Sequence, residues 1–183
     1  MSTATRPMTA DEFLAMPDDG MRHELVRGEV KTMSLPGGRH GKVAAKILRL
    51  IGNHVEAESL GDYFTAATGF LIERDPDTVR GADASFVRRE RLAAIADFTK
   101  HIPLAPDLAV EVRSPGDRPA EIAEKIREWL AAGTFLLWDV DPETRTIFIH
   151  RPGAVPITLA ELDILDGGEV LPGFRCRVGD LFA

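Results

Sequence analysis

Several residue types that define common protein classes are scarce in this 183-residue sequence. It has a single cysteine, Cys176, so an internal disulfide cannot form, and no Cys/His spacing is typical of structural zinc. No apolar run approaches the roughly 20 residues needed to span a bilayer, and the start of the chain lacks an apolar signal segment. These absences predict a soluble protein of a reducing cytoplasm, without a membrane partner.

Positively charged residues are also fewer than negatively charged ones. The 22 Lys and Arg residues face 29 Asp and Glu residues, which gives a formal net charge of −7. That balance argues against a protein that clamps nucleic-acid backbones constitutively, but it is compatible with an enzyme whose basic groups are local. Two clusters either supply such local potential or form ordinary solvated faces: Lys42, Lys46 and Arg49, and Arg88, Arg89 and Arg91.

Apolar residues, in contrast, are numerous enough for a buried core. With 44% hydrophobic residues, the chain suits one globular domain over residues 1–183, of which residues 1–8 are expected to be flexible. Capping signals, alternation and helical spacing predict the elements in order: a short helix after Thr9, a β-hairpin at 23–33, a long helix from His40, strands at 64–72, 84–87 and 108–112, helices at 88–98 and 121–132, a strand pair at 135–140 and 146–150, and short β segments ending at Phe174 and Leu181.

The order of these elements indicates the fold class. Strands come first, a strand–helix–strand unit follows at residues 107–140, and further hairpins close the chain. This order predicts an α/β protein with a mixed β-sheet, at least one helix-covered face and additional β-hairpins. An exposed strand at residues 135–138 and Ala-rich helix surfaces are possible contacts for a homodimer.

Residues 106–115 are the most informative stretch, because they predict a buried strand that carries one carboxylate, Glu111. Side chains alternate along a strand, so Glu111 shares a face with Asp107, Ala109 and Arg113, away from the apolar residues between them. A buried and unpaired carboxylate costs several kcal/mol, roughly, unless cations or hydrogen-bond donors compensate it. Partners for Glu111 are therefore expected elsewhere in the chain.

Asp83 and Lys125 are the best candidates for those partners. Asp83 lies on or at the end of a neighbouring predicted strand, where it could face Glu111. Two such carboxylates suit a hard divalent cation such as Mg²⁺, which leaves octahedral positions for water and a substrate phosphate. Lys125 lies at the border of the apolar face of the helix at 121–132, from which its ammonium could reach the carboxylates.

Structural alternatives are open for each of these residues. Glu111 could form an ion pair with Arg113 or Arg80, and Lys125 could be a solvated residue at a helix border. Glu24 could lie on the solvent face of an edge strand, and His40 could be a packing residue at a helix end. Composition and spacing alone leave the function undecided.

The ordered motifs of the chain resemble the bacterial Uma-two family of the restriction-endonuclease-like PD-(D/E)XK nuclease superfamily. The likeness covers nearly the whole chain through short pieces in a shared order: 23–29, His40 at a helix start, 81–87, 106–115, the stretch from Lys125 to Gly133, 137–142 and 171–174. The resemblance implies a restriction-endonuclease-like fold. It also implies a metal-dependent endonuclease that acts on DNA.

The resemblance assigns roles to five residues. Asp83 and Glu111 would bind Mg²⁺, for which Mn²⁺ could substitute, and Lys125 would be the catalytic lysine, displaced onto the helix after the strand. Glu24 would complete the site, and His40 would line it. The usual lysine position, two residues after the strand acid, is occupied here by Arg113, which stays protonated and cannot act as a base. Ala82 precedes Asp83, where the family often has proline.

Two rival functions belong to other classes. The first is a non-catalytic interaction protein that keeps the nuclease fold, as a homodimer, with its carboxylates held by Arg80, Arg113 or Lys125. The second is a glycoside hydrolase that uses Asp83 and Glu111 as paired acids. Two Trp and one Tyr leave little for the aromatic platform that a sugar site needs.

Overall fold

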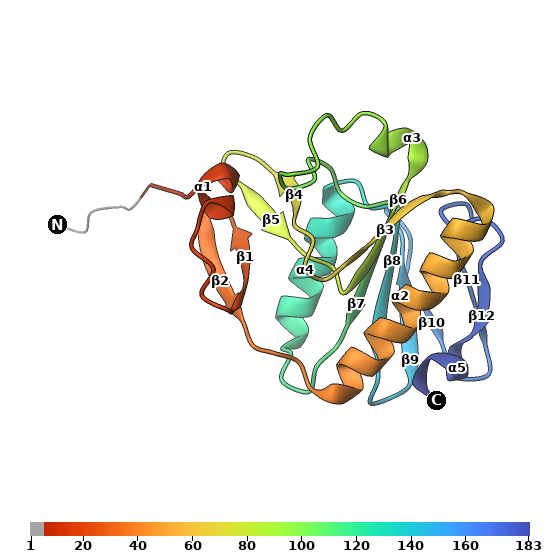
Figure 1. The fold of residues 1–183 in the computed structure, drawn as a ribbon. Coiled ribbons are helices and arrows are strands. Elements are labelled where there is room, and N and C mark those ends of the chain that lie inside the picture. The colour runs from red at the N-terminus through yellow and green to blue at the C-terminus, as the bar shows by residue number, and fades with distance from the viewer. Residues whose placement is uncertain (1–5) are drawn as a thin grey trace.

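The computed structural model describes residues 6–183 and is built around a six-stranded mixed sheet (Figure 1). The strand order is β10-β9-β8-β7-β6-β3, in which only the neighbours β7 and β8 run parallel. Helix α4 connects these two parallel strands, so β7–α4–β8 is the predicted strand–helix–strand unit. The strands of this sheet are β3 (Gly61–Thr65), β6 (Ala84–Arg88), β7 (Leu108–Val112), β8 (Leu136–Asp141), β9 (Thr146–His150) and β10 (Ile157–Leu159).

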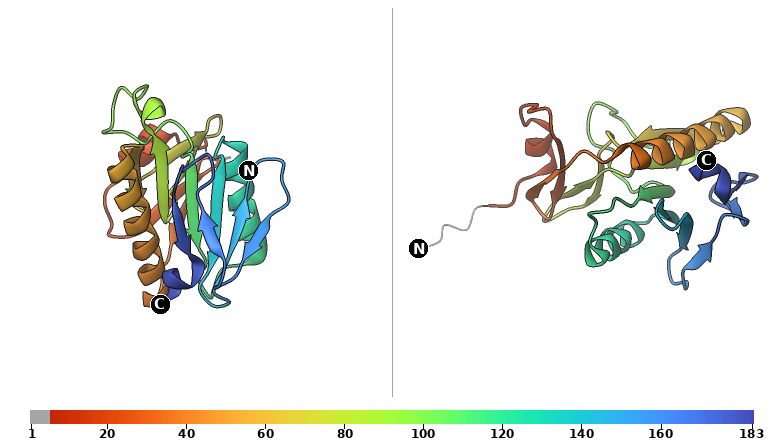
Figure 2. Two further views of the ribbon diagram at one scale, coloured as in Figure 1. Left: turned by 90° about the vertical axis from the view of Figure 1, so that its right-hand side faces the viewer. Right: turned by 90° about the horizontal axis from the view of Figure 1, so that it is seen from below.

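Two helices cover opposite faces of this sheet, as the view from below shows (Figure 2). Helix α2 (Gly38–Glu58) packs its apolar stripe on the face that carries Leu108, Val110 and Val112 of β7. Helix α4 (Pro119–Ala131) packs on the other face, where Ala109 lies. The period-2 alternation along β7 therefore sorts its side chains between two cores, and Glu111 faces the side of α4.

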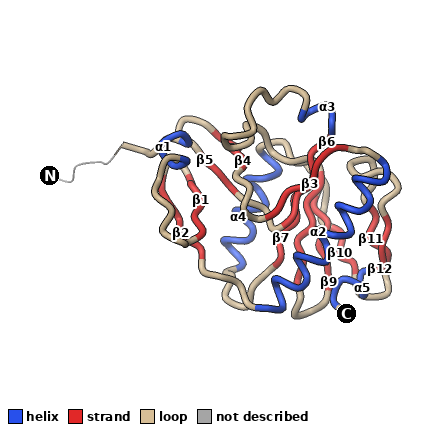
Figure 3. The backbone as a smooth tube through the Cα atoms, in the orientation of Figure 1, coloured by secondary structure: helices blue, strands red, loops and turns tan. Residues whose placement is uncertain are grey.

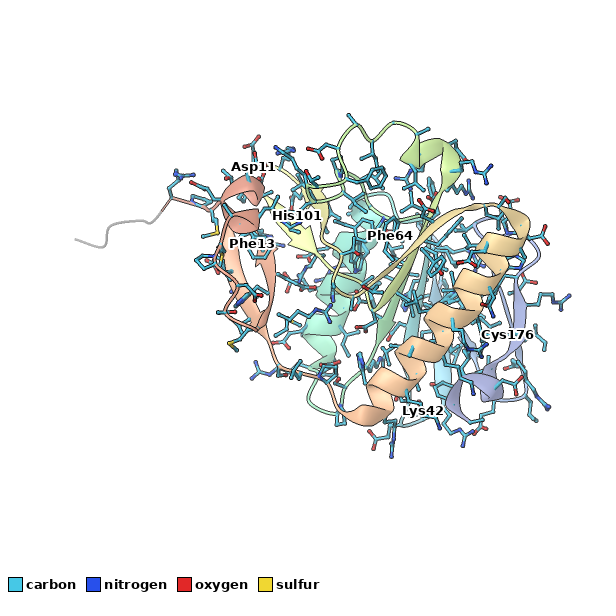
Figure 4. All side chains as sticks on the ribbon, viewed as in Figure 1. Asp11, Phe13, Lys42, Phe64, His101 and Cys176 are labelled. Atoms are coloured by element: carbon cyan, nitrogen blue, oxygen red, sulfur yellow. The ribbon has the colours of Figure 1, made fainter. Side chains whose placement is uncertain are left out.

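A second sheet of four strands lies beside the first, in the order β2-β1-β5-β4 (Figure 3). It contains the predicted hairpin and is capped by the short helix α1 (Ala10–Leu14), whose Thr9–Glu12 capping box is present. Phe13 of α1 stacks on His101, with ring centroids 5.6 Å apart, and so ties the hairpin region to the loop before β7 (Figure 4). The strands are β1 (Arg22–Val26), β2 (Glu29–Met33), β4 (Phe70–Glu73) and β5 (Thr78–Arg80).

The C-terminal segment completes the hydrophobic core on which α2 packs. A two-stranded sheet of β11 (Ile164–Asp166) and β12 (Arg175–Arg177) leads into helix α5 (Val178–Phe182). Buried residues of this segment, Leu165, Val178 and Leu181 among them, join the same hydrophobic cluster as the α2 stripe. Within residues 6–183, no helix is both long and apolar enough to cross a membrane.

Some predicted elements differ from those observed. The predicted strand at 64–72 is two strands, because β3 pairs with β6 of the large sheet whereas β4 pairs with β5 of the small one. The predicted helix at 88–98 is reduced to α3 (Arg89–Leu92), because β6 extends through Arg88 and the following residues form turns. Strand β5 was not predicted, and Leu181 lies in helix α5 rather than in a β segment.

One predicted surface is wrong. The strand at 135–138 is not exposed, because β8 lies between β7 and β9 and only Phe135 reaches solvent, so a homodimer cannot form through this strand. Of the second basic cluster, Arg88 and Arg91 contact buried Asp107, which precedes β7 at the end opposite to Glu111, and the contribution of this cluster to a local positive potential stays a prediction. The expectation for residues 1–8 lies mostly outside the described residues, and the Met8 amide donates to the Gly28 carbonyl.

Candidate active site

A cavity of about 430 Å³ brings all five predicted site residues together. Its walls come from the β1–β2 hairpin, the start of α2, the ends of β5 and β7, and helix α4. The predicted residues among those that line it are Glu24, His40, Asp83, Glu111 and Lys125. Their catalytic roles remain predictions, but their convergence is a property of the fold.

Strand pairing places the two predicted metal-binding acids side by side. Strands β6 and β7 are antiparallel, with Ala84 opposite Val110, and the Asp83 amide donates to the Val110 carbonyl at 2.9 Å. The Val112 amide in turn donates to Asp83 Oδ2 at 2.8 Å. Asp83 thus sits at the start of β6, next to the end of β7 that carries Glu111.

Glu111 is held by two donors from helix α4. Lys125 Nζ donates to Glu111 Oε2 at 2.8 Å, and Trp129 Nε1 donates to Glu111 Oε1 at 2.7 Å. Burial raises the pKa of Glu111 to about 7, with Asp83 and Glu24 adding to the rise and Lys125 opposing it. The alternative ion pairs of Glu111 with Arg113 or Arg80 are therefore wrong. The role of Trp129 was missed, although its place one turn after Lys125 was a usable signal.

Lys125 lies at the centre of the acidic cluster rather than in solvent. Besides Glu111, its Nζ approaches Glu24 Oε1 and the Gly81 carbonyl, each at 3.3 Å, and its side chain is only 17% exposed. Burial alone would lower the pKa of Lys125, but the charges of Glu111 and Glu24 raise it above its ordinary value. The alternative of a solvated helix-border lysine is wrong, and the side chain stays a fixed cation.

Glu24 is a buried residue on an interior strand. Strand β1 pairs with β2 and β5, and Glu24 is 1% exposed, so the alternative of a solvated edge position is wrong. Arg80 Nη1 donates to its Oε2 at 2.7 Å, and the Gly81 amide donates to its Oε1 at 3.1 Å. Although burial opposes the charged form, Lys125 and Arg80 hold the pKa of Glu24 below its usual value. Glu24 therefore fixes Lys125 from the hairpin side.

His40 contacts Asp83 from the first turn of α2. Its Nε2 lies 3.1 Å from Asp83 Oδ2. Burial favours the neutral imidazole, but the hydrogen bond and charge of Asp83 outweigh it and raise the pKa of His40. Burial likewise opposes ionisation of Asp83, whose pKa is nevertheless lowered by His40 and the Val112 amide. His40 is therefore a partner of one predicted metal ligand.

Arg113 pairs with an acid that the sequence did not single out. Its Nε and Nη2 donate to Asp139 Oδ1 and Oδ2 at 2.7 and 2.6 Å, and its guanidinium lies 4.7 Å from the Phe148 ring centroid. Asp139 is opposite Glu111 in the parallel β7–β8 pairing and also lines the cavity. The stretch 137–142, which is part of the family resemblance, contains Asp139, but the residue that pairs with Asp139 is set by the strand register.

Comparison with known proteins gives the family. The model of the Uma2 family, described as "Putative restriction endonuclease", matches residues 10–179. The chain belongs to the Uma2 family. A crystal structure of "a putative nuclease belonging to DUF820" from Anabaena variabilis ATCC 29413 shares 22% identity, with a TM-score of 0.81 over 96% of this chain and 98% of that one. This likeness confirms the fold predicted from the resemblance, and a comparison with curated proteins found no match.

The donor set of this Uma2 protein fits a hard divalent cation. The cavity lining offers carboxylate oxygens and no thiol, and Asp83 Oδ1 accepts no hydrogen bond among the described residues. Among the described residues, seven carboxylates and five Lys and Arg side chains line the cavity, so acidic groups are in excess there. Within residues 6–183, no group of three or more His, Cys, Asp and Glu side chains is gathered as a metal site.

The pKa of Glu111 gives a prediction for the Trp129 indole. Below about pH 7 Glu111 is protonated and a weaker acceptor, so the ¹⁵N–¹H signal of the Trp129 indole should shift with a midpoint near pH 7. The pKa of Glu111 in the folded protein exceeds its unfolded value of 4.5, so the folded state binds more protons than the unfolded state between these two pH values. The contribution of Glu111 to stability therefore falls as the pH rises from about 4.5 to about 7.

The second indole is an internal control for this titration. Trp138 lies in the other core, packed on Phe174, so its signal should stay constant over the same pH range. Glu111→Gln should abolish the Trp129 transition. A Trp129 signal that titrates equally in that variant would assign the transition to another group.

Proposed function

We propose that this protein is a metal-dependent endonuclease that hydrolyses phosphodiester bonds in DNA, with Mg²⁺ as the natural ion and Mn²⁺ as a substitute. One observation carries the proposal: Asp83 and Glu111, from neighbouring strands, meet Lys125 in a single cavity. Membership of a family described as "Putative restriction endonuclease" supports the same conclusion. Asp83 and Glu111 would hold the ion.

The ion, when bound, would activate a water molecule and withdraw charge from the phosphate. The chain's own residues would do the rest. Asp83 offers Oδ1, while Glu111 must lose its proton before it can serve as a ligand, and its raised pKa makes that loss pH-dependent near neutrality. Below pH 7 metal binding should therefore release a proton.

Lys125 would stabilise the charge that develops on the phosphate. The charges of Glu111 and Glu24 outweigh burial and raise the pKa of Lys125, which favours a charge-stabilising role for the ammonium over that of a general base. Its Nζ is fixed by Glu24, Glu111 and the Gly81 carbonyl, so little reorganisation is needed when charge appears nearby. Arg113, in contrast, is engaged by Asp139 on its Nε and Nη2.

A non-catalytic interaction protein is the second candidate, and one observation favours it. Lys125 already pairs with both Glu111 and Glu24, so these carboxylates are compensated without a metal ion. A glycoside hydrolase is less well supported, because no Trp, Tyr or Phe lines the cavity among the described residues. A cleavage assay separates the nuclease from both.

Lys125→Met tests the proposed chemistry. At saturating Mn²⁺ or Mg²⁺, the variant should cleave DNA about 10²- to 10³-fold more slowly than wild type, because a preorganised cation is lost at the site of developing charge. Plasmid and oligonucleotide cleavage under single-turnover conditions measures this rate. Lys31→Met is the matched control: it removes a lysine that lines the same cavity but pairs with exposed Glu29.

The outcomes separate the candidates. Strong loss in Lys125→Met with near-normal activity in Lys31→Met supports the nuclease. Equal activity in wild type and Lys125→Met would remove Lys125 from the mechanism. No metal-dependent cleavage by wild type over varied DNA substrates would favour the interaction protein.

A further inference from the structure

Asp83 is held asymmetrically, because within residues 6–183 two donors contact one carboxylate oxygen and no hydrogen bond reaches the other. His40 Nε2 and the Val112 amide both contact Asp83 Oδ2, at 3.1 and 2.8 Å. Among the described residues Oδ1 accepts no hydrogen bond, and its nearest cation, Arg22 Nη1, lies 3.7 Å away. Donors from a helix and from a strand thus fix the carboxylate plane, and Oδ1 is the oxygen left for a ligand of the cavity.

The position of His40 is one that packing alone would give to an apolar residue. It lies on the buried stripe of α2 with Val43, Ile47 and Ile51, and it is 9% exposed. Its Nδ1 is buried and has no hydrogen-bond partner among the described residues. An unsatisfied buried nitrogen costs stability, and a leucine would avoid that cost. The contact that distinguishes histidine from leucine here is the one to Asp83.

We infer that His40 is a positioning residue: its Nε2–H orients Asp83 so that Oδ1 faces the cavity and can bind a divalent cation. This inference rests on the proposed function. It does not depend on the charge of the imidazole, because the neutral Nε2–H tautomer and the imidazolium both donate from Nε2. Hydrogen bonds that orient metal ligands contribute to metal affinity, and their loss typically weakens binding about 10- to 100-fold.

The experiment compares Mn²⁺ binding by wild type, His40→Leu and His40→Gln in calorimetric titrations. His40→Leu keeps the apolar packing and removes the donor, so its dissociation constant should rise about 10- to 100-fold. His40→Gln should bind within about threefold of wild type, because its amide nitrogen can donate to Asp83 Oδ2 from nearly the same place as Nε2. In cleavage assays, a higher Mn²⁺ concentration should restore most of the kcat of His40→Leu.

Thermal unfolding and circular dichroism of each variant show whether the fold is kept. If His40→Leu does not fold, His40→Met removes the donor with a flexible side chain that fills the same space. Rescue by glutamine is the measurement that a purely structural role would not produce.

Five outcomes decide the inference. Weak binding by the leucine variant with rescue by glutamine supports it, and the same pattern without DNA cleavage by any protein would support it while overturning the proposed function. Wild-type affinity in His40→Leu, or equal weakening in His40→Gln, would overturn it and leave the proposed function intact. Absence of Mn²⁺ binding by wild type at millimolar concentration, even with DNA present, would overturn both.

Discussion

Asp83→Asn is expected to slow DNA cleavage by about 10³-fold or more at saturating Mg²⁺. A bound ion contributes several kcal/mol of transition-state stabilisation, and each 1.36 kcal/mol corresponds to about a tenfold change in rate. Asparagine keeps one oxygen to accept from His40 Nε2 and the Val112 amide, so the fold should survive. The NH₂ group of asparagine then takes the place of Oδ1, and because it is a hydrogen-bond donor it cannot bind a cation. Single-turnover cleavage measures the loss.

Asp117→Asn is the matched control for this prediction. Asp117 lines the same cavity, but its carboxylate accepts from the Ser114 amide, a bond that asparagine can keep. We expect cleavage within about threefold of wild type, because the change removes a charge without removing a proposed ligand. Cleavage by Asp83→Asn within tenfold of wild type would exclude Asp83 as an essential ligand.

Arg80→Met should have the largest effect on stability. The guanidinium bridges Glu24 and Glu128, with Nη1 2.7 Å from Glu24 Oε2 and Nε 2.9 Å from Glu128 Oε2. Its removal leaves buried Glu24 and half-buried Glu128 short of a partner, and breaking a buried pair in this way costs about 3 to 5 kcal/mol of unfolding free energy. Urea unfolding at pH 7 measures the change.

The pH dependence of this loss tests its cause. Burial would raise the pKa of Glu24 in the folded protein, but Lys125 and Arg80 lower it. The stabilisation from these ion pairs is therefore fully present above the unfolded-state pKa of Glu24 and is lost as the pH falls through its folded-state pKa. The difference between Arg80→Met and wild type should therefore shrink at acidic pH.

Arg27→Met is the control for this site, because exposed Arg27 lies 3.8 Å from the same Glu128. It should cost less than about 1 kcal/mol. A similarly small cost for Arg80→Met would show that the bridge contributes little.

Local sequence patterns predict the placement of Glu111 well. Alternation between 106 and 113 predicts that Glu111 points away from Leu108, Val110 and Val112, and the structure has these residues on opposite faces of β7. Helical spacing also predicts α2 and α4, because both helices bury one apolar stripe. Strand alternation and helical spacing repeat within a few residues, so a short stretch of sequence is enough to predict these features.

Other contacts depend on long-range strand pairing that no local pattern signals, and they could not be predicted. Glu24 is buried because β5, only three residues long and without a distinctive pattern, pairs beside β1. The Arg113–Asp139 pair depends on the register of β7 against β8, which the connection through α4 sets. The split of residues 64–72 likewise follows from two strands joining different sheets. In each case the deciding partner is distant in sequence.

Calorimetric titration of Mn²⁺ into wild type and Glu111→Gln tests most directly the claim that the two strand acids form a metal site. Glutamine can still accept from Trp129 Nε1, and Lys125 keeps Glu24 as a partner, so the variant should fold. We predict saturable binding by wild type at pH 8, where Glu111 is ionised, and a loss of at least about 100-fold in the variant. Equal affinity in the two proteins, or no binding by wild type at millimolar Mn²⁺ even with DNA present, would contradict this claim and make Glu111 a structural ion-pair residue.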